Sequence, residues 1–212
     1  MLVAGPVSMA MRLWRGRPAS TRCDMCALTE GRTMDTALLV LRVAVGLPLA
    51  GHGVQKLFGW CGGGGLTAAT WFFRSVGYRP PRLMAGLSGG AELVAGVALA
   101  AGLGTPLAAA VVIATMLNAA VAAHTRNRLF AIDGGYGYPV GIAMLAATLG
   151  FTGAGGISLD AILNQGDGSL EGGLSTLALG LLAGIFVLLG RDAPRSGARP
   201  ASTWLSRNRM AG

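Results

Sequence analysis

Apolar positions along this chain fall into long runs that short polar segments separate. No charged residue occurs from Leu93 to Ala123, and none from Gly134 to Leu159. A helix of about 20 mostly apolar residues is long enough to cross the hydrocarbon core of a membrane. The pattern therefore predicts an all-α fold, a polytopic bundle with membrane-spanning helices at residues 36–53, 83–103, 105–123, 138–156 and 172–190.

One further segment, residues 66–76, is too short to cross the membrane. It places Trp71, Phe72 and Phe73 beside Arg74, a mixture of aromatic and basic side chains that is typical of the membrane interface. We expect a short helix that lies in the interface between the first and second spans.

Glycine spacing suggests where the spans approach each other. Gly86 and Gly90 in the second span, and Gly180 and Gly184 in the fifth, have the four-residue spacing that lets two helix backbones come close. We therefore expect both pairs to face neighbouring helices.

The two ends of the chain are polar and basic. Residues 1–33 carry five arginines and no long apolar run, which predicts a disordered basic arm, and residues 191–212 form a basic tail with five more. Met34 opens the first apolar segment and is an alternative start of translation that would leave out the arm.

The composition agrees with a membrane protein, because only 12% of the residues are charged and the mean hydropathy is +0.57. The net charge of +8 does not indicate nucleic-acid binding, since the basic residues lie at the chain ends and in loops. With an outside N-terminus, the loops and tail on the inner side carry 11 Lys and Arg, against five in the arm. The positive-inside rule then predicts a cytoplasmic C-terminus.

Few motifs carry chemistry. Cys23 and Cys26 have C-x-x-C spacing but no strand-helix pattern around them, so we predict no redox or metal site there. No phosphate-binding loop, zinc-protease motif or nucleophile elbow occurs, which argues against hydrolytic and nucleotide-driven enzymes.

Two ionisable residues lie inside predicted spans, Arg42 in the first and Glu92 in the second. Because a charge at the centre of a membrane helix costs about 2.5–3.5 kcal/mol, such residues usually face the bundle interior and pair with one another. We predict a structural ion pair between them that fixes the register of the two helices.

The first span ends in GHGVQKLFGW, which places His52, Gln55 and Lys56 at the inner membrane surface. At about 100° per residue, His52 and Lys56 share a stripe about 80° wide with Arg42. His124 emerges on the same side at the end of the third span, where Thr115 and Asn118 lie deeper and can add hydrogen bonds.

Three interpretations of this cluster remain open. In the first, the polar residues are interfacial side chains with hydrated tips. In the second, they border a pocket for a quinone head group, where His52 and His124 exchange protons and Lys56 binds an anion. In the third, His52 and His124 ligate haem, which is less favoured because nothing else marks a porphyrin site.

Several motifs in order resemble the DoxX family of small bacterial and archaeal membrane proteins. They are LLVLRVAVGLPLAGHGVQKLFGW with a glycine-rich turn, ATWFFRSVGYRPP, LSGGAELVAGVALAAGLGTPLAA, NAAVAAHTRN, DGGYGYPVGIAML and SLD, which together cover about Leu38 to Asp160. The resemblance implies a four-helix membrane domain at residues 34–160. A loop and a fifth span follow at residues 161–190.

Relatives in the family are subunits of quinone-linked sulfur oxidation, including thiosulfate:quinone oxidoreductase, or partners in thiol-redox assemblies. The resemblance implies that the family's polar residues correspond here to Arg42, His52, Gln55, Lys56, Glu92 and His124. Gly137 departs from the pattern, because relatives often have an acidic residue there.

These observations together predict an integral subunit of a redox complex in a bacterial inner membrane that passes electrons from a sulfur or thiol donor to quinone. We expect His52 and His124 to be catalytic, His52, Gln55 and Lys56 to bind quinone, and no metal to be held. The expected partners are the lipid bilayer and a soluble redox or sulfur-transfer protein. The alternatives are a non-catalytic membrane anchor or scaffold and a small-solute carrier, for which no inverted repeat is visible.

Overall fold

A computed structural model describes residues 24–60, 62–124, 135–164 and 168–192, with the side chains of 24–29 and 122–124 excepted. Within these ranges the chain forms helices and no β-strand. The helices are α2 (Asp24–Phe58), α3 (Gly65–Ser75), α4 (Pro81–Ala101), α5 (Thr105–His124), α6 (Gly137–Thr152), α7 (Leu159–Ile162) and α8 (Leu170–Leu189).

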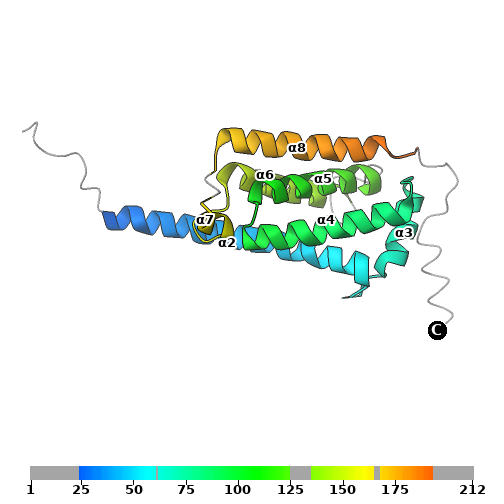
Figure 1. Ribbon diagram of the computed structural model, residues 1–212, viewed down its shortest axis with the longest axis horizontal. Helices are drawn as coiled ribbons and strands as arrows, with labels where there is room; N and C mark the ends of the chain where they lie inside the picture. Colours follow the sequence, from blue (N-terminus) through cyan, green and yellow to red (C-terminus); the bar gives the residue numbers. More distant parts are fainter. Residues whose placement is uncertain (1–23, 61, 125–134, 165–167, 193–212) are drawn as a thin grey trace, which may run out of the picture.

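Five long helices lie side by side as an all-α bundle (Figure 1). α2 packs on α4, α4 packs on α5, and α5 packs on both α6 and α8. Three segments are long and apolar enough to cross a membrane, Glu30–Phe58, Pro81–Ala101 and Leu170–Leu189, while α5 and α6 are shorter apolar helices beside them. All five predicted spans are therefore helices, and the chain is a multi-pass membrane protein.

The first helix is longer than the sequence pattern predicts. α2 begins at Asp24, so residues 24–33, which we expected to belong to a disordered arm, form its first turns (Figure 1). The apolar pattern misses these turns because residues 30–34 are exposed and need no apolar face. Residues 1–23 lie outside the described part of the chain.

The close packing of α2 on α4 depends on glycines from both helices. A methyl group at Gly46 would lie 2.4 Å from the carbonyl oxygen of Gly96, and one at Gly53 would lie 2.6 Å from that of Gly89. No larger side chain fits such contacts, because van der Waals contact between carbon and oxygen needs more than 3 Å.

Only one of the two predicted glycine pairs makes the expected contact. Gly180 and Gly184 face α5, where added methyl groups would lie 2.8 Å from Ala110 and Leu117 respectively. Gly86 and Gly90 have nothing within 4 Å of an added methyl group, so the prediction for this pair is wrong. α4 packs on α2 through a different face, which carries Gly89, three residues after Gly86, and Gly96, six residues after Gly90.

The interfacial helix is confirmed as a short element. α3 packs against the ends of α2 and α4 and has no buried residue. Trp71 and Phe72 are about two-fifths exposed, as expected for aromatic side chains at a membrane surface.

The end of α8 is tied to the loop between α3 and α4. The Asp192 amide donates to the Gly77 carbonyl over 3.0 Å, and the Arg79 Nε lies 2.9 Å from the Asp192 carboxylate. The chain therefore crosses the bundle five times, and its described ends, Asp24 and Asp192, lie at opposite ends of the molecule (Figure 1).

Candidate functional site

Arg42 and Glu92 do not form the predicted ion pair. Gly46 lies against Gly96 and Gly53 against Gly89, so Glu92 is level with about residue 50 of α2, roughly 12 Å along the axis from Arg42. Side chains also tilt toward the N-terminus of their own helix, and α2 and α4 are antiparallel. Arg42 therefore reaches away from Glu92, which is why the prediction is wrong.

Arg42 instead lies at the other end of the bundle, where it is fully buried. Its Nη2 donates to the carbonyl oxygen of Ile157. The Asp160 carboxylate, which attracts Arg42 electrostatically, accepts hydrogen bonds from the Gly104 and Thr105 amides over 2.6 and 2.9 Å. Asp160 therefore caps the first turn of α5 and places a negative charge near the buried guanidinium.

Glu92 pairs with Lys56 at the end of α2. The Lys56 Nζ lies 2.5 Å from Glu92 Oε1 and 3.3 Å from the Ser88 hydroxyl. The Glu92 side chain is only 4% exposed, whereas that of Lys56 is 26% exposed. The pair thus joins a buried carboxylate to a partly hydrated ammonium group.

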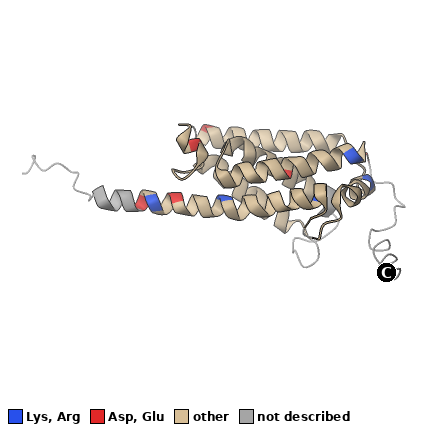
Figure 2. Ribbon diagram, turned by 60° about the horizontal axis from the view of Figure 1, so that its bottom comes forward, with Lys and Arg blue, Asp and Glu red and all other residues tan. Residues whose placement is uncertain are grey.

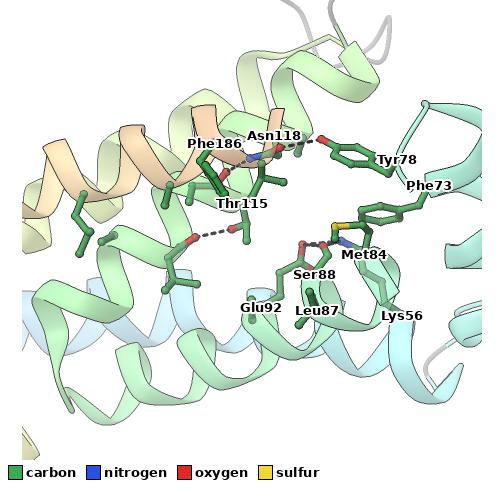
Figure 3. Close-up of a pocket in the computed structure, with 18 of the residues that line it drawn as sticks. Lys56, Phe73, Tyr78, Met84, Leu87, Ser88, Glu92, Thr115, Asn118 and Phe186 are labelled. Atoms are coloured by element: carbon green, nitrogen blue, oxygen red, sulfur yellow. Dashed lines mark hydrogen bonds and ion pairs between the residues drawn. The ribbon is translucent and has the colours of Figure 1, made fainter. Parts of the chain in front are cut away.

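This ion pair lies on the wall of a cavity of about 540 Å³ (Figure 3). α4 and α8 form its sides, α5 forms its floor, and α3 and the following loop close one end. The surface of the cavity is almost entirely apolar apart from the side chains at this end. Its lining residues are Lys56, Phe73, Tyr78, Met84, Leu87, Ser88, Ala91, Glu92, Leu107, Ala110, Val111, Ala114, Thr115, Asn118, Ala119, Leu179, Ala183, Phe186 and Val187.

A second polar group lies on the opposite wall (Figure 3). The Tyr78 hydroxyl donates to Asn118 Oδ1 over 2.8 Å, and Asn118 Nδ2 donates to the backbone of Ala114 and Gly184. Burial raises the pKa of Tyr78 above its ordinary value of 10, so the phenol keeps the proton that this bond requires. Asn118 therefore joins α5, α8 and the α3–α4 loop.

Of the three residues in the sequence GHGVQKLFGW that we expected to bind quinone, only Lys56 lines the cavity. His52 is exposed and Gln55 is half-buried outside the cavity. The buried face of α2 carries Leu38, Arg42 and Leu49, and His52 falls about 80° from Arg42, just beyond its edge. His52 therefore does not line this cavity, and its role in quinone binding stays a prediction.

Other predicted residues cannot be placed. The side chains of His124 and Cys26, and Cys23 entirely, lie outside the described residues. Among the residues that are described, no group of three or more His, Cys, Asp or Glu side chains is close enough to hold a metal ion.

Sequence reasoning missed two polar residues of the cavity, Ser88 and Tyr78. Ser88 precedes Glu92 by four residues, so the helical period already placed both on one face of α4. No signal in the sequence identified Tyr78, because its contact with Asn118 depends on how the α3–α4 loop folds over α5.

The DoxX family model matches residues 37–125. No curated protein and no solved structure matches the chain. The matched region runs from α2 to α5 and includes Lys56, Ser88, Glu92 and Asn118, whereas α8, the remaining side of the cavity, follows it. Residues 37–125 of this multi-pass membrane protein therefore carry a DoxX domain within the helical bundle.

Proposed function

We propose that this protein is the membrane subunit of a redox complex and that its cavity binds the quinone that accepts electrons from a sulfur or thiol donor. The observation that carries the proposal is an apolar cavity within the membrane domain whose end holds a buried carboxylate and an ammonium group. A quinone has the matching shape, since a polar head group is joined to a long apolar tail.

The rim of the cavity supports access from the lipid. Leu87, Leu107, Leu179 and Phe186 line the cavity and are each at least half exposed. In a membrane, apolar side chains that are exposed on the outer surface of spanning helices contact lipid tails. An isoprenoid tail can therefore remain in the bilayer while the head group lies near Lys56 and Ser88.

The polar end supports binding of a quinone ring. Lys56 and Ser88 supply hydrogen-bond donors for a carbonyl oxygen, and Phe73 and Tyr78 supply aromatic surface beside it. The chain has no sequence motif for a flavin or nucleotide, so the proposal places the chemistry of the donor in a soluble partner protein.

The experiment is a titration of the purified protein in detergent with decylubiquinone. Ala91→Leu places a larger side chain inside the cavity, and we expect it to weaken binding at least tenfold, because the ring and the new side chain would occupy the same space. Gly90→Leu is the matched control, since a Cβ atom added at Gly90 meets nothing within 4 Å and Gly90 does not line the cavity.

The His52→Ala variant tests whether the quinone binds in the cavity or at His52, where the sequence predicted it. We expect this variant to bind decylubiquinone like the wild type, because His52 does not line the cavity. If folded wild-type protein does not bind the quinone, the redox proposal is refuted in favour of a membrane anchor or scaffold. Equal binding by the Ala91→Leu variant would place the quinone elsewhere.

A further inference from the structure

The Glu92 carboxylate has one oxygen engaged and one free. Oε1 accepts from Lys56 over 2.5 Å, with the Ser88 hydroxyl 3.5 Å away. Oε2 is buried and has no hydrogen-bond partner in the structure. A buried acceptor without a partner is costly, so a bound ligand that donates a hydrogen bond to this oxygen would be favoured.

The opposite wall of the cavity cannot supply that donor. The Thr115 hydroxyl lies 3.0 Å from the Val111 and Val112 carbonyl oxygens, both amide hydrogens of Asn118 go to backbone oxygens, and Tyr78 donates to Asn118. The donors on this wall are therefore engaged within the protein. Lys56, Ser88 and Glu92 lie together on the other wall (Figure 3), and this wall carries the unpartnered Glu92 Oε2.

The two redox forms of a quinone differ in what they offer to this wall. The quinone has two carbonyl oxygens, which are acceptors only. A carbonyl oxygen placed beside Glu92 Oε2 would bring two acceptors together without a hydrogen between them. The quinol has two hydroxyl groups, and one can donate to Oε2 once a turn of the Glu92 carboxylate brings this buried oxygen to the cavity surface. The oxygen of the same hydroxyl group can accept from Lys56, which has a third N–H beyond those directed at Glu92 and Ser88.

We propose that Glu92 Oε2 selects a ligand with a hydroxyl donor, so that the cavity binds the quinol more tightly than the quinone. This inference rests on the proposed function, because it concerns the same ligand class. A charge-assisted hydrogen bond that only one form can make corresponds to about a tenfold difference in affinity. Glu92 is thus a specificity-determining residue for the redox state of the ligand.

The preference has a consequence for electron transfer. Stabilising the quinol relative to the quinone raises the midpoint potential of the bound couple. For a two-electron couple, a tenfold difference in dissociation constant corresponds to about 30 mV. The site would therefore make the bound quinone a stronger acceptor for the sulfur or thiol donor.

The experiment compares the affinities of decylubiquinone and decylubiquinol for the purified protein under anaerobic conditions. We expect the wild type to bind the quinol about tenfold more tightly, and Glu92→Gln to reduce this ratio to about one, because the neutral amide accepts more weakly and can also donate. Glu171→Gln is the matched control, since Glu171 is an exposed carboxylate at the start of α8, and its ratio should equal that of the wild type.

The outcomes separate this inference from the proposed function. If neither form binds to folded wild-type protein, the proposed function fails. If both bind but with equal affinity, or if Glu92→Gln keeps the wild-type ratio, quinone binding stands and the role of Glu92 is refuted. A thermal unfolding curve for each variant shows whether it is folded, and Glu92→Asp provides a second test, because its shorter carboxylate should weaken the preference without removing the charge.

Discussion

Asp160, with its buried carboxylate, connects three parts of this protein, the start of α5, the turn before it and Arg42 of α2. It is 2% exposed, it accepts from two backbone amides at the start of α5, and it lies near the buried Arg42 guanidinium. Its own amide donates to the Gly102 carbonyl over 2.8 Å, and Gly102 adopts a φ of 68° that a residue with a side chain rarely takes. The segment after α6 is thereby fixed to the turn between α4 and α5.

Replacing Asp160 with Asn tests this arrangement at the scale of one residue. The amide has only one acceptor oxygen for two backbone donors and no charge for Arg42, so we expect the variant to lose about 2–3 kcal/mol of stability. The measurement is thermal or denaturant unfolding of the purified protein in detergent micelles.

Asp192→Asn is the control for Asp160→Asn. Asp192 is 61% exposed and pairs with Arg79 at the surface, so its loss should change the stability by no more than about 0.5 kcal/mol. Equal effects of the two substitutions would show that Asp160 does not have the structural role described above.

The sequence predicted that the two charged residues inside the spans are buried, but not which residues they contact. Glu92 and Arg42 were correctly expected to face the bundle interior, because charges inside spans are too costly to face lipid. Their partners were not predictable, since a helical pattern gives the face of a residue but not the register between two helices. That register places Lys56, and not Arg42, within reach of Glu92.

At the scale of elements, the glycine contacts between α2 and α4 set this register. Gly46 and Gly96 bring the backbones together near one end, and Gly53 and Gly89 do so nearer the other. The sequence holds 35 glycines, so their spacing alone does not identify the ones at contacts. The Gly86 and Gly90 pair has the expected spacing but lies on a face with open space.

A pair of alanine substitutions in α4 distinguishes the two faces. Gly96→Ala would place a methyl group 2.5 Å from the Ala50 backbone nitrogen, and we expect a loss of about 1–3 kcal/mol because neither backbone can easily move. Gly86→Ala meets nothing and should be neutral or stabilising by up to about 1 kcal/mol through better helix propensity. Unfolding of both variants in the same detergent gives the comparison, and a loss at Gly86 that equals the loss at Gly96 would contradict the packing.

At the scale of the whole molecule, charge is divided between the two ends of the bundle (Figure 2). Among the described residues, Arg74, Arg79, Arg82 and Arg191 lie at the end where α3 is located, with Asp192 the acidic exception. Asp35, Asp160 and Glu171 lie at the opposite end, together with Arg32. By the positive-inside rule the α3 end is predicted to face the cytoplasm.

Reporter fusions in a bacterial host test this orientation. Green fluorescent protein fused after residue 79 or after residue 192 should fluoresce, because both positions lie at the basic end, whereas alkaline phosphatase fused after residue 104 should be active outside the cytoplasm. The reverse pattern would show that the α3 end faces outward. Fluorescence after residue 79 but not after residue 192 would contradict five crossings.

The sequence by itself determined the class of fold, the positions of the five long helices and the short interfacial helix between the first two. This is possible because a membrane helix satisfies its own backbone hydrogen bonds and enters lipid according to its own composition, so each span is a local property of the chain. The same locality explains the error in α2, whose exposed first turns carry no apolar signal.

Only the tertiary structure decided which polar residues meet. The sides of the cavity are formed by α4 and α8, which are more than 60 residues apart in the sequence. The partner of its Glu92 carboxylate, Lys56, comes from the end of α2. These contacts follow from helix register and rotation, which close packing between specific glycines and their neighbours fixes. His52, the most conspicuous residue of the sequence GHGVQKLFGW, was therefore left at the surface, while Lys56, one helical turn later, reached the site.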